Sequence, residues 1–179
     1  MAGLSLESKR EILLQLTRGK IGFRLIEDAD RAFLFDLYAS TRDWEFQQTS
    51  WTEADWRDFL QGQFAAQDLH YQRAFPNAIR RIVQIDGMDI GRLYIDRQDD
   101  CLRIIEFTLA PTARGRGIGS DILRSLMNEA HGGKVPVRLH VEKQSPALKL
   151  YLRLGFRAVS DQGHHCAMEW MPNTAPREI

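Results

Sequence analysis

The sequence predicts an α/β fold in which helices flank a mixed, mostly antiparallel central sheet of about six to seven strands. Three observations predict it. Short β-type runs separated by turn residues follow one another from Ala78 onward. A glycine-rich turn leads into an amphipathic helix with its apolar side chains on one face. The chain has 179 residues, 44% of them hydrophobic, which fits one domain with a sizeable core.

The first half of the chain is expected to be mainly helical. Residues 8–11 have the S-x-x-E form of a capping box, so residues 1–20 are expected to form a helical appendage. Residues 21–26 alternate as a strand, and Asp28 or Asp30 then opens a helix. A second, longer helix is expected to begin at Thr52.

Strands and helices alternate in the second half. The period-2 runs predict strands over residues 79–85, 89–95, 102–109, 135–142, 156–159 and 165–170. A helix over 117–131 is expected to end at Gly132 and Gly133, and Ser145 begins a second helix that ends at Gly155. We therefore expect one domain over 21–172 and a polar tail over 173–179.

Composition excludes several classes of protein. Lys plus Arg and Asp plus Glu both number 24, so there is no net field to attract nucleic acid or a membrane surface. No apolar run approaches the length of a membrane span. Cys101 and Cys166 lack the spacing of a zinc site, and adjacent His164 and His165 would point to opposite faces of a strand, so no metal site is expected. These features favour a cytoplasmic protein.

The turn between Leu109 and Ser120 carries the clearest chemical signal. Its three glycines allow a close approach of backbone to ligand, and the following helix offers N–H groups with partial positive charge, which suits a pyrophosphate. The turn lacks the lysine of a P-loop, and its G-x-G-x-G spacing differs from that of a dinucleotide fingerprint. What it does fit is an R-x-x-G-x-G pattern at Arg114, Gly117 and Gly119.

Together with the L-Y-x-x-x-G-F form of residues 150–156, this pattern resembles the GNAT family of acetyl-coenzyme A-dependent N-acetyltransferases. The resemblance runs from about Ile79 to Trp170, and more loosely from Ile21. It implies the GNAT acyl-CoA N-acyltransferase fold, with acetyl-CoA as acyl donor. Gln144 stands where the family often has asparagine. The residues that the resemblance implies for binding acetyl-CoA are Leu109, Arg114, Gly115, Arg116, Gly117, Ile118, Gly119, Ser120 and Gln144.

The resemblance also implies direct transfer of acetyl to a primary amine, with Tyr151 as general acid. Two residues are candidates for the general base. Glu106 is the first, because it is expected on the same face as Leu102, Ile104 and Thr108, where a carboxylate needs a function or a partner. His140, expected on the opposite face from Val137, is the second, and a water molecule is the remaining alternative.

The acceptor stays open among a small molecule, a peptide and a protein, and a longer acyl donor such as succinyl-CoA is a further alternative. Five aromatic residues in the first half of the chain would line an acceptor pocket unless they belong to the hydrophobic core. A second function is a catalytically weak acyl-CoA-binding regulatory module, and a third is an interaction protein in which the glycine turn is structural. The family commonly forms dimers, so the resemblance leaves a homodimer open, but nothing in the sequence fixes the oligomeric state. The aromatic residues are Trp44, Trp51, Trp56, Tyr71 and Phe75.

Overall fold

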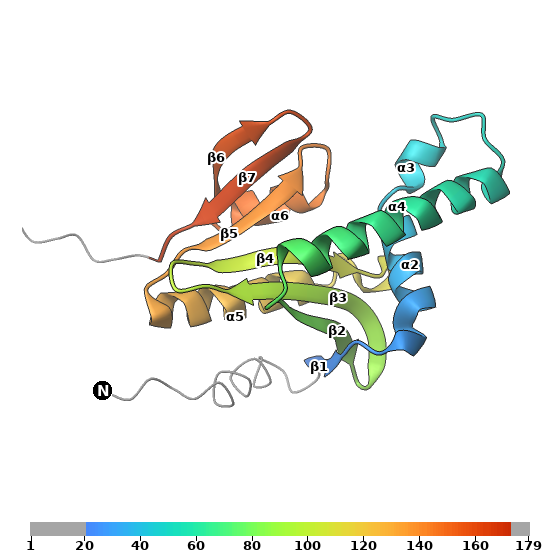
Figure 1. The fold of residues 1–179 in the computed structure, drawn as a ribbon. Coiled ribbons are helices and arrows are strands. Elements are labelled where there is room, and N and C mark those ends of the chain that lie inside the picture. Colours follow the sequence, from blue (N-terminus) through green and yellow to red (C-terminus); the bar gives the residue numbers. More distant parts are fainter. Residues whose placement is uncertain (1–20, 173–179) are drawn as a thin grey trace, which may run out of the picture.

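A computed structural model describes residues 21–172 as one seven-stranded sheet covered by helices on both faces (Figure 1). The strand order is β1-β2-β3-β4-β5-β7-β6. Within the described residues only β4 and β5 pair in parallel, so the predicted mixed, mostly antiparallel sheet is confirmed. The strands are β1 (Ile21–Leu25), β2 (Ile79–Ile85), β3 (Met88–Arg97), β4 (Leu102–Leu109), β5 (Val137–Glu142), β6 (Arg157–Gln162) and β7 (His165–Trp170).

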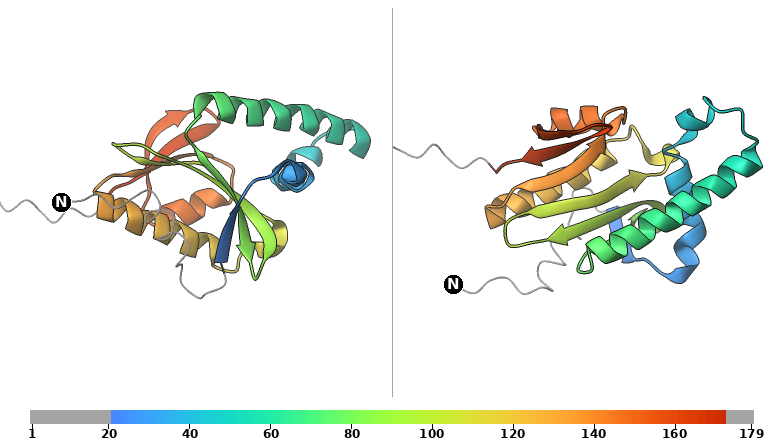
Figure 2. Two further views of the ribbon diagram at one scale, coloured as in Figure 1. Left: turned by 60° about the horizontal axis from the view of Figure 1, so that its bottom comes forward. Right: turned by 45° about the horizontal axis from the view of Figure 1, so that its top comes forward.

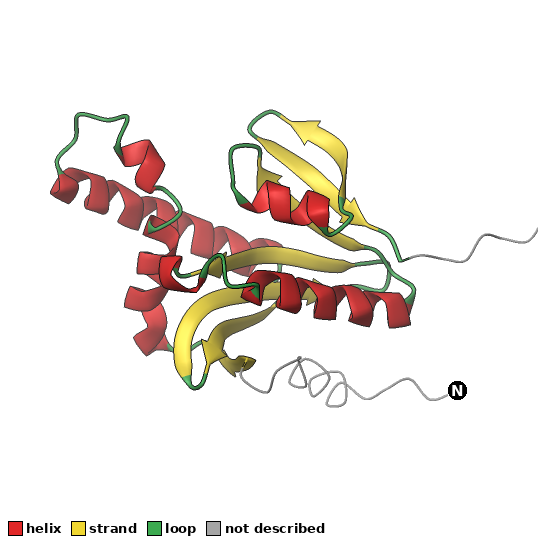
Figure 3. Cartoon of the chain, turned by 180° about the vertical axis from the view of Figure 1, so that it is seen from behind, coloured by secondary structure: helices red, strands yellow, loops and turns green. Residues whose placement is uncertain are grey.

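Two groups of helices cover the two faces of the sheet. The helix α4 crosses the front of the sheet in Figure 1, whereas α5 and α6 lie on the back, as Figure 3 shows. The two views in Figure 2 show the sheet between these layers. The helical elements are η1 (Asp28–Asp30), α2 (Arg31–Ala39), α3 (Asp43–Phe46), α4 (Glu53–Ala74), η2 (Pro111–Ala113), α5 (Ile118–Gly133) and α6 (Ala147–Arg153).

Each helical layer buries its own core. Five apolar residues of α5 pack onto the sheet with Tyr151 of α6, which explains the amphipathic pattern of the α5 sequence. On the other face, Phe35 and Tyr38 of α2 meet Phe64 of α4, with ring centroids 5.9 and 5.7 Å apart, and Ile82 of β2 lies beneath them. The helices on both faces are therefore held by apolar contact.

Helix α5 ends later than predicted. The helix expected to stop at Gly132 and Gly133 includes both glycines, and the left-handed residue that ends it is Lys134, with φ 55°. The predicted end was therefore too early. It was placed at the glycines because glycine is the usual residue in the left-handed conformation that ends a helix. The predicted N-terminal appendage (1–20) and polar tail (173–179) lie outside the described residues.

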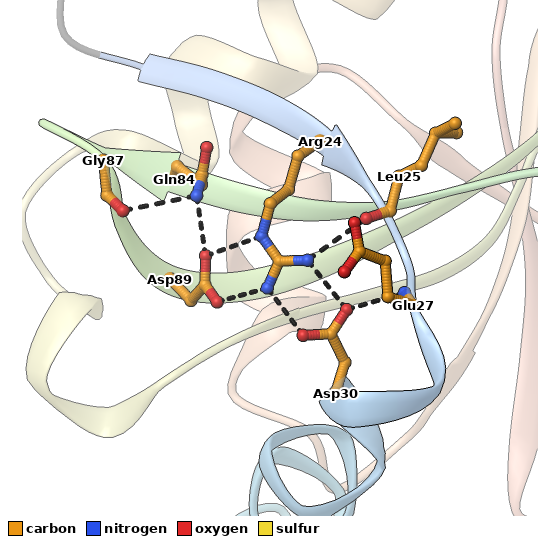
Figure 4. A network of polar contacts seen from close by, with 7 residues as sticks. All are labelled: Arg24, Leu25, Glu27, Asp30, Gln84, Gly87 and Asp89. Atoms are coloured by element: carbon orange, nitrogen blue, oxygen red, sulfur yellow. Dashed lines mark hydrogen bonds and ion pairs between the residues drawn. The ribbon is translucent and has the colours of Figure 1, made fainter.

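An ion-pair network fixes the first connection of the fold (Figure 4). The Arg24 guanidinium on β1 reaches Asp30 at the start of α2, with an N–O distance of 2.6 Å, and also Asp89 on β3. Asp30 in turn accepts a hydrogen bond from the backbone N–H of Glu27 at 2.8 Å. Because one guanidinium holds two carboxylates from different elements, the start of α2 is tied to the sheet.

A close approach between β3 and β4 gives a test of the fold. A Cβ atom at Gly91 would lie 2.5 Å from the carbonyl oxygen of Thr108. We therefore expect Gly91→Ala to lower the free energy of unfolding by about 1–3 kcal/mol in urea denaturation. Gly62→Ala, inside α4 with open space around the new methyl group, should instead raise it by about 0.5–1 kcal/mol. Equal effects at the two positions would contradict the close approach.

Candidate active site

The sheet opens where its one parallel pair ends. Strands β4 and β5 pair only over Leu102–Ile104 and Val137–Leu139. Beyond these residues β4 continues beside β3 and β5 continues beside β7, and the two strands diverge in Figure 1. The last residues of β4 therefore have a neighbouring strand on one side only, which leaves backbone groups on the other side available to a ligand.

A β-bulge decides which side chains of β4 face which helices. Ile95 of β3 pairs with Ile104 of β4. The residue before it, Tyr94, pairs with Glu106, so Ile105 is an extra residue in β4. As a result Ile104 faces α5, whereas Glu106 faces α4. The expectation that Glu106 shares a face with Leu102 and Ile104 was wrong, because the alternation was counted without the bulge.

Glu106 lies in a buried polar cluster beneath α4, together with Arg92, Tyr71 and Thr108. Its Oε2 is 3.2 Å from an Arg92 nitrogen and accepts a hydrogen bond of 3.1 Å from the Tyr71 hydroxyl. Its Oε1 accepts one of 2.6 Å from Thr108. Arg92 is only 2% exposed and also donates to Gln67 of α4 at 3.2 Å. The carboxylate thus has a compensating cation and two hydroxyl donors.

Tyr151 lies on the other side of the sheet, buried in the core that α5 and α6 share. Its ring packs edge-on against Phe156 with centroids 5.5 Å apart. Burial raises the pKa of Tyr151 above its ordinary value, and the negative charge of Glu106 raises that pKa further. Glu106 is on the α4 face, so the two groups interact across the place where β4 and β5 have separated.

The glycine-rich turn lies at the start of α5. Gly115 and Gly117 have φ angles of 74° and 84°, and nothing lies within 4 Å of where their Cβ atoms would be. Gly117 is the N-cap of α5, and no side chain caps the helix. The N–H groups of its first turn, at Ile118, Gly119 and Ser120, therefore have no capping side chain. The backbone of the preceding turn leaves the space beside them open. Such a helix end attracts anions.

The two arginines of the turn behave differently. Arg116 is exposed. Arg114 turns back: its Nε donates to the carbonyl oxygen of Leu109 at 2.8 Å, and a terminal nitrogen donates to the Ser40 hydroxyl at 2.7 Å. Arg114 therefore ties the end of β4 to the end of α2. Sequence reasoning assigned both arginines to ligand charge and missed this structural contact.

A second arginine, Arg42, connects the segment after α2 to strand β5. Arg42, between α2 and α3, lies 3.6 Å from a carboxylate oxygen of Glu142 at the end of β5. Its guanidinium also lies over the Tyr38 ring, 4.9 Å from the centroid, and pairs with Glu45 at 2.8 Å. The segment after α2 thus contacts both strands that border the opening, β4 through Arg114 and β5 through Arg42.

The remaining sequence candidates lie farther out. His140 is exposed on β5, opposite Val137 as expected, and pairs with Ala167 of β7. Burial and the positive charge of Arg103 lower its pKa. Gln144 is exposed in the loop before α6. Neither residue contacts Glu106 or Tyr151 within the part of the chain that the structure describes. No group of His, Cys, Asp and Glu in residues 21–172 could hold a metal ion.

Arg92 was missed by sequence reasoning, although a signal for it existed. It lies in the segment from Ile90 to Ile95, in which all the remaining residues are hydrophobic apart from Gly91. A charged residue in such a buried strand needs a partner, and Glu106 on the next strand is the matching acid. A search for opposite charges in adjacent strands would have found this pair.

Comparison with known proteins gives a consistent result. Residues 78–158, from just before β2 into β6, match the family model described as an acetyltransferase (GNAT) domain. A PaiA N-acetyltransferase from Thermoplasma acidophilum, solved in complex with coenzyme A, is similar in structure, with a TM-score of 0.62 and 16% identity. The match covers 84% of this chain and 98% of that one.

Two further solved structures share the fold. The ribosomal-protein-S18-alanine N-acetyltransferase from Escherichia coli has a TM-score of 0.57 at 15% identity, covering 89% of this chain and 98% of that one. Arabidopsis thaliana Naa50, in complex with the bisubstrate analogue CoA-Ac-MVNAL, has a TM-score of 0.52 at 14% identity, covering 84% and 97%. The described domain therefore has the GNAT acyltransferase fold, and its residues 78–158 match the GNAT acetyltransferase domain model.

Proposed function

We propose that residues 21–172 form an N-acetyltransferase that moves acetyl from acetyl-CoA to a primary amine. The observation that carries this proposal is the divergence of β4 and β5, which leaves the end of β4 without a strand on one side and beside the start of α5, where Gly119 lies against Leu109. Tyr151 and Glu106 would supply an acid and a base at this opening, as direct transfer between two substrates requires. The similarity to acetyltransferases supports the reaction class.

The start of α5 fits the diphosphate of acetyl-CoA. The N–H groups of Ile118, Gly119 and Ser120 would donate to it, and the exposed Arg116 adds positive charge. Side chains at Gly115 or Gly117 would fill the space that lies open above the turn. When bound, acetyl-CoA supplies an acetyl group activated as a thioester. The PaiA neighbour, solved with coenzyme A, supports this assignment.

The end of β4 would bind the extended arm of the same ligand. Its residues from Glu106 to Leu109 pair with β3 but not with β5, so backbone groups on one side can pair with amides of a ligand, apart from the Leu109 carbonyl oxygen that already accepts from Arg114. A backbone N–H in this row would also stabilise the oxygen that gains negative charge in the tetrahedral intermediate. Gln144, at the loop after β5, is the weakest of the proposed contacts.

Tyr151 serves best as a proton donor. Its pKa lies above the ordinary value of 10.0, so the hydroxyl keeps its proton throughout the neutral range. It would donate to the sulfur atom that leaves with a pair of electrons. The same raised pKa makes Tyr151 a poor general base, which is consistent with two separate groups handling the two protons of the reaction.

Glu106 is the better-placed base. An amine of pKa about 10.4 must lose its proton before it attacks, which costs about 4–5 kcal/mol at pH 7. The Glu106 carboxylate, beside Arg92, would accept that proton directly or through a water molecule. His140 is exposed and contacts neither Glu106 nor Tyr151 within the described residues. An acyl-CoA-binding module with weak catalysis is the second candidate function. A catalytic role of Tyr151 would favour the enzyme over this module.

The glycine turn gives the test of the donor site. Gly117→Glu should weaken acetyl-CoA binding in titration calorimetry by about a hundredfold or more, because it fills the open turn and repels phosphate. Gly87→Glu is the matched control, since Gly87 has a similar φ of 81° and open space but lies in the β2–β3 turn. If both variants bind acetyl-CoA like the parent, the placement of the donor is wrong.

Removal of one hydroxyl tests the acid. Tyr151→Phe should lower kcat by about 10²–10⁴-fold while the Kd for acetyl-CoA changes little, because the phenol acts on the leaving sulfur. In the parent, kcat should show no alkaline fall below pH 10 from this residue, because its pKa is raised. An unchanged kcat in the variant would make Tyr151 structural and favour the binding module.

Two variants separate the candidate bases. Glu106→Gln keeps the shape of the side chain, and it should lower kcat/KM by about 10²-fold or more. His140→Gln should leave kcat/KM close to that of the parent. Thermal melts establish that each variant is folded. A large fall of kcat/KM in His140→Gln alone would reverse the assignment.

A further inference from the structure

The free end of α4 carries a hollow outside the proposed active site. Trp51, Asp55, Asp58 and Phe59 line this open hollow of about 350 Å³. We propose that it binds an arginine or lysine side chain of a polypeptide acceptor, at a distance from the amine that is acetylated. The inference rests on the proposed function and names the class of its acceptor. We refer to these four residues as the aromatic–acidic hollow.

Its two rings form walls at right angles. Trp51 and Phe59 have centroids 5.2 Å apart and an interplanar angle of 89°. Both rings are well exposed, at 47% and 41%. Trp56 supports them from the side of α2, with centroids 6.0 Å from Trp51 and 5.5 Å from Phe59. Exposed aromatic faces held in a fixed arrangement attract a cation that has an apolar stem.

The two carboxylates supply the matching charge. Asp55, Asp58 and Phe59 stand at positions i, i+3 and i+4, so they share one face of the helix. Capping accounts for Asp55, whose backbone N–H and carboxylate bond to Thr52. Asp58 lies a turn further on and forms no ion pair within residues 21–172. Helix capping therefore leaves both Asp58 and the exposed rings unexplained.

The length of α4 sets how long an acceptor must be to contact both the hollow and the proposed active site. Tyr71, which donates to Glu106, lies twelve residues after Phe59, about 18 Å along the helix axis. An extended polypeptide covers this distance in about five or six residues. Figure 1 shows this end of α4 beyond the sheet, on the side toward which β4 and β5 diverge. A small amine is too short to reach both places, whereas a peptide is long enough.

Charge complementarity favours a basic peptide over a second copy of this chain. A symmetric dimer through the hollow would bring Asp55 and Asp58 of one copy against the same carboxylates of the other. Like charges at such short range oppose association. A basic side chain instead pairs with the carboxylates while its stem covers the rings.

The test compares two peptides with a free N-terminal amine. One carries arginine as its sixth and seventh residues, and the other carries glutamine there. Arginine is chosen because it cannot itself be acetylated. With the full chain and acetyl-CoA, we expect kcat/KM to be about tenfold higher for the arginine peptide. Asp58→Asn and Trp51→Ala should reduce this ratio to about one without lowering kcat/KM for the glutamine peptide.

Controls distinguish the outcomes. Asp99→Asn makes the same charge change in the exposed β3–β4 turn and should keep the preference. A peptide with its arginines at the second and third positions should lose the advantage. Calorimetry of peptide binding to the chain without acetyl-CoA tests the hollow even if no peptide is acetylated, so the two proposals fail separately. Equal binding of both peptides, or a dimer in light scattering that Trp51→Ala dissociates, would overturn the inference.

Discussion

The short parallel pairing between β4 and β5 is the constraint on which the rest of the site depends. Three residue pairs hold the strands together, and beyond Ile104 each follows a different neighbour. The bulge at Ile105 coincides with this divergence and turns Glu106 toward α4. Because the backbone itself opens, Tyr151 on one face is influenced by a charge on the other. Without the divergence, the sheet would separate these two groups.

The helices on the α4 face are bound to this opening by three arginines, of which Arg92 is buried, Arg42 is half-buried and Arg114 is exposed. Arg92 connects Glu106 to Gln67 of α4, and Arg114 connects the end of β4 to Ser40. Arg42 makes the corresponding contact to the end of β5. For the buried Arg92 an unpaired charge would be costly, so this arginine restricts how α4 lies on the sheet. Arg42 and Arg114 add contacts between the end of α2 and the two strands that border the opening.

The sequence was informative about elements and much less so about their three-dimensional relations. Alternation and capping predicted the strands and the main helices, because these signals are local. The glycine turn was visible for the same reason. The face of Glu106 was wrong, since a bulge depends on the register with β3 and leaves no local mark. Arg92 and the inward turn of Arg114 depend on partners 14 and 74 residues away, which periodicity cannot report.

The opening between β4 and β5 arises from backbone register rather than from any particular side chain. Its lining can therefore change in evolution while the opening itself persists. The chain and the PaiA protein share their fold at only 16% identity. Selection for a new acceptor would act on the projecting end of α4 and the loop before it, where substitutions leave the paired strands untouched. The backbone register and the projecting surface of α4 can thus vary independently of each other.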